Sequence, residues 1–447
     1  MAKNLIRSLG LVSAVALIPA ATAALAAVDV NTYRELDQFM AVFERVRSEY
    51  VEQVDDKTLL RGAIDGMLNS LDPHSSYLDE RGFKQLMTTT DGEYGGLGLS
   101  VTMEDSTVKV MSVTEDTPAE RAGIKSGDYL THIDGKLIYG GTLDEAVDQM
   151  KGPPGSTVSV TVLRVGRDKP FDVRITRAII ELKAVKWEIK DRVGIINVNG
   201  FNKTTTDATL AAMTAIEKSL GGKPLGYILD LRSNPGGLLD QAVGLSDVFL
   251  ERGEVVSQRG RKKGDIERYY ARPGDRAEGL PVIVLVDAGS ASAAEIVAAA
   301  LQEHHRAIVM GERTFGKGSV QTLLPLTQQT ALRLTTARYF TPSGKSVQEG
   351  GITPDIVVPQ LSDPDYKDRP RFRESDLRRH LINEVKLEDE AVQDDGKPDP
   401  RFTATADELK KKGIEDYQLH YALQTISRLG KGQQAAAPGS PKGGARR

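Results

Sequence analysis

The sequence predicts an α/β protein, and three observations support that prediction. Apolar strands alternate with helices over residues 179–360, short alternating strands precede them at 85–178, and helical patterns occur near both ends. Hydrophobic residues make up 40% of the 447-residue chain and 43 Gly are added to them, a composition typical of folded protein. At ~150 residues per domain, the length allows about three domains.

Residues 1–27 are typical of an export signal. Lys3 and Arg7 precede a short apolar run, and small residues from Ala21 to Ala26 offer cleavage sites. The run is too short for a comfortable membrane span, and an uncleaved inner-membrane anchor is the alternative. We therefore expect a mature protein without a stable membrane span, exported most simply to a bacterial periplasm.

Residues 28–84 show helical spacing. Apolar side chains recur from Leu36 to Tyr50, and a second stretch from Leu59 to Leu71 is closed by Asp72-Pro73. We expect this apolar helical pair to pack on the next domain or on a second subunit.

Residues 85–178 change to short alternating strands between Gly and Asp turns, which predicts a small β-rich domain with one helix at Leu143 to Met150. Residues 179–360 contain continuous apolar strands, which are typical of a buried, largely parallel sheet. The expected strands are 194–198, 226–231, 281–286 and 307–310, and the expected helices are 208–220, 239–249 and 291–301.

The C-terminal region, residues 361–429, is densely charged apart from an amphipathic helical stretch at 417–429. Residues 430–447 are rich in Gly, Ala, Pro, Lys and Gln. We expect a disordered tail there, with a partner-binding arm as the alternative.

The composition excludes several classes of function. The formal net charge of −4 argues against nucleic-acid binding, which usually requires a basic excess. The absence of Cys excludes thiol nucleophiles, thiolate metal sites and disulfides, and the 6 His show no metal-ligand spacing. We expect no metal and no cofactor. The chain also lacks a G-x-S-x-G motif, which weakens a Ser–His hydrolase interpretation.

A serine-bearing turn follows the apolar strand at 281–286. Ser290 and Ser292 precede an Ala-rich helix, where a hydroxyl meets the positive end of the helix dipole and neighbouring N–H groups can bind an oxyanion. Ser292 and Glu295 also match a capping box, which would serve helix stability alone. The residues by themselves leave both serines as candidate nucleophiles, with capping as the alternative role.

A lysine-bearing loop follows the strand at 307–310. Residues 311–318 nearly spell a phosphate-binding loop, but Gly318 replaces the required Ser or Thr, and extended chain follows instead of a helix. A buried lysine between glycines can instead become neutral and take a proton from a serine hydroxyl. Lys317 is therefore a candidate base, with an ordinary surface lysine as the alternative.

The β-rich stretch resembles a PDZ domain of the bacterial, circularly permuted type. The resemblance rests on the Gly-rich turn at 95–99 and on Asp116-Thr-Pro-Ala119, Ala122-Gly-Ile124 and Gly127-Asp128. It implies that the C-terminal end of a peptide binds by strand addition, with its carboxylate on backbone N–H groups. The implied peptide-binding residues, which favour an apolar terminal side chain, are Gly96, Leu97, Gly98 and Leu99.

Taken together, the motifs resemble those of the C-terminal processing (tail-specific) serine proteases, Ser–Lys peptidases with an inserted PDZ domain. The matching motifs are Asp72-Pro-His-Ser-Ser-Tyr-Leu78, Asp230-Leu-Arg-Ser-Asn-Pro-Gly-Gly237 and Tyr339-Phe-Thr-Pro-Ser-Gly344. The serine-bearing turn and the lysine-bearing loop described above match as well. The resemblance implies an α/β protease core with a small β-rich PDZ domain and helical N- and C-terminal segments.

The family pattern also implies roles for single residues. It makes Ser292 rather than Ser290 the nucleophile, Lys317 the base and Gln321 the residue that orients the base. The implied oxyanion hole consists of the N–H groups of Ala293 and Gly237, with Gly236 as the alternative to Gly237.

The resemblance implies a serine endopeptidase that recognises protein C-termini through its PDZ domain and cleaves by a Ser–Lys acyl-enzyme mechanism, processing or degrading periplasmic proteins. It further implies substrates with apolar C-termini, homo-oligomerisation through terminal helices and a helical-repeat lipoprotein adaptor. Two rival interpretations are a PDZ-bearing scaffold with a silent core and an acyl-CoA enzyme on a related fold. The match at Ser292, Lys317 and Gln321 speaks against the scaffold, and we find no CoA site in the sequence.

Overall fold

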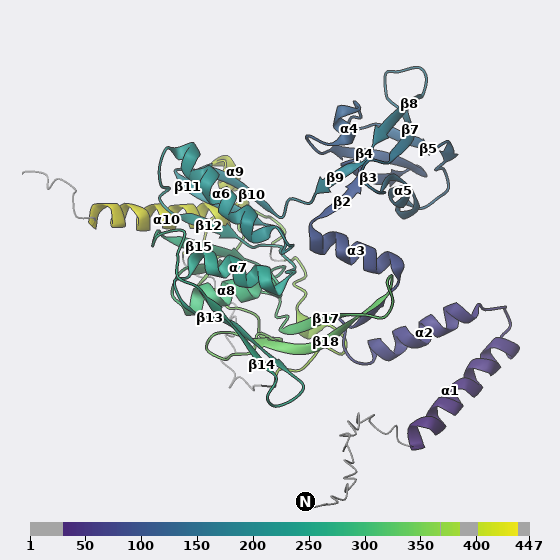
Figure 1. Cartoon of the computed structure of the whole chain (residues 1–447). Coiled ribbons are helices and arrows are strands. Elements are labelled where there is room, and N and C mark those ends of the chain that lie inside the picture. The colour runs from purple at the N-terminus through teal and green to yellow at the C-terminus, as the bar shows by residue number, and fades with distance from the viewer. Residues whose placement is uncertain (1–29, 367, 385–400, 437–447) are drawn as a thin grey trace, which may run out of the picture. The chain divides into compact units, whose positions relative to one another are not determined.

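The structure is a computed structural model that describes residues 30–366, 368–384 and 401–436 (Figure 1). The predicted signal peptide, residues 1–27, lies outside the described residues. The chain divides into two compact units, one ending at Gly66 and one beginning at Met67. Within the described ranges, no helix combines the length and the apolar character needed to cross a bilayer.

The first unit contains the predicted helical pair. It consists of α1 (Val30–Glu49) and most of α2 (Asp56–Asn69). The large apolar side chains of α1 are exposed in the single chain, Tyr33 at 59%, Leu36 at 53% and Met40 at 50%. A partner for this apolar face remains a prediction.

The segment after α2 is partly extended, whereas the sequence predicted a helical segment over 28–84 that is interrupted at Asp72-Pro73 and no strand within it. β1 (Ser76–Leu78) pairs antiparallel with β18 (Ala331–Phe340), and α3 (Glu80–Asp91) follows and continues past residue 84, the predicted end of the helical segment. β1 forms because a strand far away in the sequence supplies its hydrogen bonds, which local periodicity does not reveal.

The predicted β-rich domain has a sheet and a core of its own. Val108, Leu130 and Val160 are fully buried in that core. The sheet has the order β3-β4-β5-β7-β8, so that β3 lies at one edge in the described part of the chain. The elements are β2 (Glu93–Gly96), β3 (Leu99–Glu104), β4 (Thr107–Val113), α4 (Pro118–Arg121), β5 (Tyr129–Ile133), β6 (Lys136–Leu137), α5 (Leu143–Met150), β7 (Thr157–Leu163), β8 (Phe171–Thr176) and β9 (Ala178–Glu181), of which β2 pairs with β9.

The predicted core sheet follows with the order β10-β11-β12-β15-β16-β19. Neighbouring strands from β11 to β19 are parallel, which confirms the largely parallel sheet, while β10 pairs antiparallel with β11. The elements are β10 (Val185–Lys190), β11 (Val193–Val198), α6 (Thr205–Leu220), β12 (Tyr227–Asp230), α7 (Leu239–Phe249), β15 (Val282–Val286), α8 (Ala293–Glu303), β16 (Ile308–Gly311) and β19 (Ile356–Val357).

Both faces of this sheet are covered by helices (Figure 1). Alternate residues of a strand point to opposite faces. In β15, Val284 packs with residues of α6, α7 and α8, whereas Ile283 and Leu285 pack with residues of α10. Ser292 and Lys317 follow β15 and β16, so they lie at the carboxyl edge of a sheet that is buried on both faces.

The sequence prediction missed a second, antiparallel sheet. It consists of β1, β13 (Gly253–Gly260), β14 (Ile266–Ala271), β17 (Ser319–Pro325) and β18. These strands are only partly buried and carry charged side chains, so they lack the continuous apolar runs that marked the core strands.

The C-terminal region contributes η1 (Glu374–Asp376), α9 (Ala406–Lys411) and α10 (Tyr417–Ala436). The expected amphipathic helix is present as α10, but it extends beyond Gly430, so the predicted disordered tail cannot begin there. A Cβ on Gly430 would lie 2.5 Å from the Leu225 carbonyl oxygen, which shows that the helix packs closely against the core at this glycine. Residues 437–447 lie outside the described residues.

Candidate active site

Ser292 lies in the turn between β15 and α8, at the carboxyl edge of the parallel sheet. Its backbone has φ 55° and ψ −114°, a conformation that residues other than Gly rarely adopt. It lines a cavity of about 950 Å³. Strained residues of this kind cluster at functional sites because the surrounding structure must hold them in place.

Ser290, the other serine of the turn, holds the turn together. Its side chain is fully buried, and its Oγ donates to the Leu231 carbonyl at 2.8 Å and accepts the Asp287 N–H at 2.9 Å. Ser292 is therefore the stronger candidate nucleophile of the two.

Glu295 connects the serine turn to the lysine loop. Its fully buried carboxylate accepts the N–H groups of Ser292 at 2.7 Å, Gly316 at 2.7 Å and Lys317 at 3.0 Å. It also accepts the Thr314 hydroxyl at 2.6 Å. Burial raises the pKa of Glu295 to about 7, although all four hydrogen bonds favour the ionised form. The capping carboxylate predicted from the sequence thus holds two segments together.

Lys317 lies between β16 and β17 and lines the same cavity as Ser292. The side chain reaches the cavity surface, but protein atoms surround most of its ammonium group. Burial lowers the pKa of Lys317; the carboxylate of Glu374 opposes this effect and the guanidinium of Arg333 adds to it. A lowered pKa increases the fraction of neutral amine that a general base requires. Lys317 is therefore not an ordinary surface lysine.

Gln321 lies on β17, which follows the lysine loop as the predicted extended chain and not as the helix of a phosphate-binding loop. Its Nε2 donates to Ser319 Oγ at 3.0 Å and to Thr335 Oγ1 at 3.2 Å. Gln321 lines the same cavity as Ser292 and Lys317, so the structure brings all three predicted catalytic residues together.

Residues far apart in the sequence support the lysine loop. The Gly318 N–H donates to Gln348 Oε1 at 2.9 Å, and Gln348 Nε2 donates to the fully buried Glu374 at 3.1 Å. His74 Nε2 lies 2.9 Å from both carboxylate oxygens of Glu374. Sequence reasoning missed Glu374 because it lies in the charged C-terminal region, where nothing in its surroundings distinguishes it.

Tyr339 is a second residue that sequence reasoning did not assign to the site. Its buried hydroxyl donates to the Lys317 backbone carbonyl, and Tyr339 lines the same cavity as Ser292. Burial raises the pKa of Tyr339 well above its ordinary value, so the phenol stays neutral. Its position within a motif of the family pattern was the available signal.

The loop that follows β12 supplies the predicted oxyanion-hole glycines. A Cβ on Gly236 would lie 2.7 Å from the Ser292 Cβ, so this loop packs directly on the serine turn. The Gly236 N–H donates to Asn234 Oδ1 at 2.9 Å. Over the described ranges, the N–H groups of Gly237 and Ala293 donate to no protein acceptor. This favours Gly237 over Gly236 as the partner of Ala293.

The remaining cavity wall is largely apolar. The apolar side chains that line it include Leu86 of α3, Leu239 of α7, Ile296 of α8, and Val320 and Leu323 of β17. An apolar wall beside the nucleophile favours substrates with apolar side chains near the cleaved bond.

The Gly-rich turn of the β-rich domain spans the end of β2 and the start of β3. Gly96 ends β2 and Leu99 begins β3, with Leu97 and Gly98 between them. Leu97 is buried in the domain core, so only its backbone could contact a ligand. Gly98 has φ 82°, and a Cβ there would lie 2.3 Å from the Thr117 Cβ, which explains the requirement for Gly.

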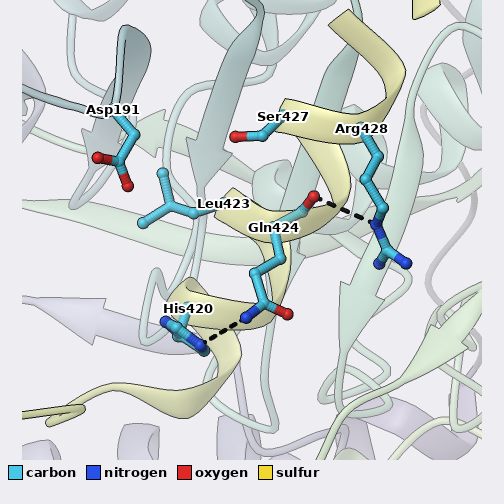
Figure 2. A pocket seen from close by; sticks show the side chains of 6 residues that line it. All are labelled: Asp191, His420, Leu423, Gln424, Ser427 and Arg428. Atoms are coloured by element: carbon cyan, nitrogen blue, oxygen red, sulfur yellow. Dashed lines mark hydrogen bonds between the residues drawn. The ribbon is translucent and has the colours of Figure 1, made fainter. Parts of the chain in front are cut away.

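A second, smaller pocket lies on α10 (Figure 2). His420 Nε2 and Gln424 Nε2 form a hydrogen bond of 2.8 Å, and Arg428 Nε donates to the backbone carbonyl of Gln424 at 3.3 Å. None of the predicted site residues lines this pocket within the described chain.

Comparisons with known proteins show the family to which the chain is similar. The family model described as peptidase family S41 matches residues 192–358, the PDZ domain model matches 95–175, and the model described as the activating protease CtpB N-terminal domain matches 18–82. A carboxy-terminal-processing protease of Bartonella bacilliformis is 52% identical over 353 residues, which cover 78% of this chain and 81% of that protein. The carboxy-terminal processing protease CtpA of Bacillus subtilis is 37% identical over 338 residues, covering 75% and 71%. The solved structure of the photosystem II D1 C-terminal processing protease is similar with a TM-score of 0.43 and 27% identity, covering 74% of this chain and 94% of that one.

Proposed function

Because this chain belongs to peptidase family S41, among its carboxy-terminal processing proteases, we propose that it is an exported endopeptidase that binds protein C-termini through its PDZ domain and cleaves the bound protein by a Ser–Lys mechanism. The observation that carries the mechanism is that Ser292 and the largely buried Lys317 line one cavity. Glu295 holds the backbones of both residues through one carboxylate oxygen.

In the proposed reaction, neutral Lys317 takes the proton of Ser292 Oγ as the oxygen attacks a peptide carbonyl carbon. The carbonyl oxygen becomes an oxyanion, which accepts the N–H groups of Gly237 and Ala293. Lys317 then returns its proton to the leaving amine, the C–N bond breaks and an acyl-enzyme remains. Neutral Lys317 then deprotonates a water molecule, which attacks the ester carbonyl carbon. The ester C–O bond breaks, Ser292 Oγ takes the proton back from Lys317, and the acid product leaves.

The PDZ domain is the proposed reader of the substrate end. β3 lies at an edge of its sheet in the described part of the chain, where an extended peptide can add as a further strand. The backbone of the turn from Gly96 to Leu99 precedes this edge and is the proposed carboxylate site. Substrates with apolar C-termini are proposed by family resemblance alone, since Leu97 is buried in the domain core.

Cellular context is proposed on sequence features. The N-terminal export pattern supports a periplasmic location, and the apolar face of α1, with Tyr33 and Leu36 exposed, supports homo-oligomerisation. A helical-repeat lipoprotein adaptor that delivers substrates completes the proposal by family resemblance.

The decisive experiment compares mature wild-type protein with Ser292→Ala and Lys317→Ala variants. Each is incubated with an unfolded protein that ends in an apolar residue, and the fragments are identified by mass spectrometry. Fragments from the wild type alone support the protease and locate its cleavage sites. Retained binding of the substrate end with no fragments from any variant, even with excess enzyme, favours the PDZ-bearing scaffold instead.

A further inference from the structure

We propose that Asp72 sets the orientation of the Gln321 side-chain amide through the hydroxyl of Thr335, and thereby positions the Lys317 base. The inference rests on the proposed function, since it assigns positioning residues to the Ser–Lys reaction. It adds a positioning residue, Asp72, from a segment that precedes the PDZ domain in the sequence.

The first step is the environment of Asp72. This side chain is 4% exposed, and its carboxylate accepts the N–H groups of His74 at 2.8 Å and Ser75 at 2.9 Å. It also accepts the hydroxyls of Ser75 at 2.7 Å and Thr335 at 3.1 Å. Burial raises the pKa of Asp72, but these hydrogen bonds together outweigh burial and lower it. Asp72 is therefore ionised at neutral pH and acts only as an acceptor.

The second step is the direction of the Thr335 hydroxyl. Because Asp72 can only accept, the single proton of Thr335 Oγ1 is committed to the carboxylate. The Thr335 oxygen must then act as an acceptor toward Gln321, which contacts it at 3.2 Å. Only the NH₂ end of the Gln321 amide can donate there.

The third step is the consequence for Lys317. With the Gln321 NH₂ group directed to Thr335 and to Ser319, the carbonyl oxygen Oε1 is the end that can accept from the Lys317 ammonium. A reversed amide would bring Oε1 against a Thr335 oxygen that has no proton to offer it. Asp72 thus selects one of two amide orientations, and that orientation suits a lysine that must donate and accept protons in turn.

The segment that carries Asp72 is itself fixed. The Thr335 N–H donates to Ser75 Oγ at 3.1 Å, and β1 pairs with β18 from Ser76 to Leu78. Asp72 therefore meets Thr335 only while this segment is seated on β18.

The test uses Thr335→Val, which keeps the shape and removes the hydroxyl, with Thr335→Ser as the conservative rescue. Thr336→Val is the matched control, because the neighbouring Thr336 is exposed and pairs with Thr322. With a fluorogenic peptide ending in an apolar residue, kcat of Thr335→Val should fall about tenfold with KM unchanged, the effect of one lost hydrogen bond. Thr335→Ser should restore most of kcat, and Thr336→Val should match the wild type.

The second arm combines Thr335→Val with Gln321→Ala. If Thr335 acts through Gln321, the double variant should be no slower than Gln321→Ala alone. The proposed chain of hydrogen bonds from Asp72 through Thr335 to Gln321 is overturned if the two losses of kcat multiply in the double variant. It is also overturned if Thr335→Val is as fast as the wild type. A wild type that does not cleave, or a Gln321→Ala variant with full activity, overturns the proposed mechanism instead. If Thr335→Val is unfolded at the assay temperature, Asp72→Asn takes its place. The NH₂ group of this variant can donate to Thr335 Oγ1 and so reverse the Gln321 amide. We expect the same loss of kcat, and no further loss when it is combined with Gln321→Ala.

Discussion

Oε2 of Glu295 accepts the backbone N–H of Lys317 at 3.0 Å. The same oxygen accepts the Ser292 N–H at 2.7 Å, so one atom determines the spacing between the segments that carry the candidate nucleophile and base. The other oxygen accepts Thr314 and Gly316 from the lysine loop. The two loops follow neighbouring strands, β15 and β16, and the carboxylate joins them.

Replacement of this carboxylate should separate the loops. Glu295→Gln keeps the shape but turns one acceptor oxygen into an NH₂ donor that faces existing donors. We expect the free energy of unfolding to fall by about 2 kcal/mol and cleavage to be nearly abolished. Urea unfolding and a peptide-cleavage assay measure the two effects, and Glu188→Gln, at an exposed position on β10, serves as the control for cleavage. A Glu295→Gln enzyme with wild-type activity would contradict this role.

The pH dependence of cleavage should follow Lys317. Burial lowers its pKa below the ordinary lysine value of 10.5, so the neutral amine appears at lower pH than in a free lysine. We expect kcat/KM to rise with pH through the folded-state pKa and to level off above it. Lys317→Arg, which stays protonated, should be inactive at every pH. A profile that is flat from about pH 6 to about pH 9 under single-turnover conditions argues against a lysine base.

The oxyanion hole can be tested through its glycines. A Cβ on Gly237 would lie 2.1 Å from the Phe201 carbonyl oxygen, so Gly237→Ala must shift the loop that carries its N–H. We expect kcat to fall about 100-fold with a smaller change in KM, because the N–H acts on the transition state. Gly222→Ala is the control, since no atom lies within 4 Å of a Cβ there. Equal kinetics for the two variants would remove Gly237 from the mechanism.

The sequence predicted the core sheet well because continuous apolar runs report burial directly. β12 and β15 are buried at every position and fall inside the predicted strands. The second sheet escaped prediction because its strands are only partly buried and its pairings are distant: Ser76 pairs with Arg333. No local pattern carries that information.

The residues of the candidate site likewise differ in whether the local sequence can predict them. Ser292 and Lys317 stand out locally, each in a Gly- or Ser-rich turn after a buried strand. The choice between Ser290 and Ser292 needed either a family pattern or the hydrogen bonds that occupy Ser290. Glu374 and Thr335 were beyond local reasoning, since their roles arise from contacts with residues about 300 and 260 positions away.

Asp416, the residue before α10, should stabilise the loop that follows β12 through an ion pair with Arg232. Arg232 Nη1 and Nη2 contact Asp416 at 2.9 Å and 2.7 Å, just before α10 begins, and Nη2 also contacts Asp230 at 2.6 Å. Burial raises the pKa of Asp416, but its hydrogen bonds and the Arg232 charge outweigh burial and lower it. A carboxylate with a lowered folded-state pKa stabilises the fold above its ordinary pKa of 3.8, and this contribution is lost as pH falls through the folded-state value.

We therefore expect Asp416→Asn to lower the free energy of unfolding by about 2 kcal/mol at pH 7, because a charged hydrogen-bond partner is lost from a largely buried guanidinium. The difference from the wild type should shrink as the pH falls below the ordinary pKa of 3.8 and through the lowered folded-state pKa, because Asp416 itself then takes up a proton. Asp407→Asn removes the same charge from an exposed position on α9 and should leave stability nearly unchanged. Urea unfolding at several pH values measures all three proteins. A destabilisation of Asp416→Asn that does not vary with pH would show that the side chain acts by packing and not by its charge, because only the charge is removed by acid.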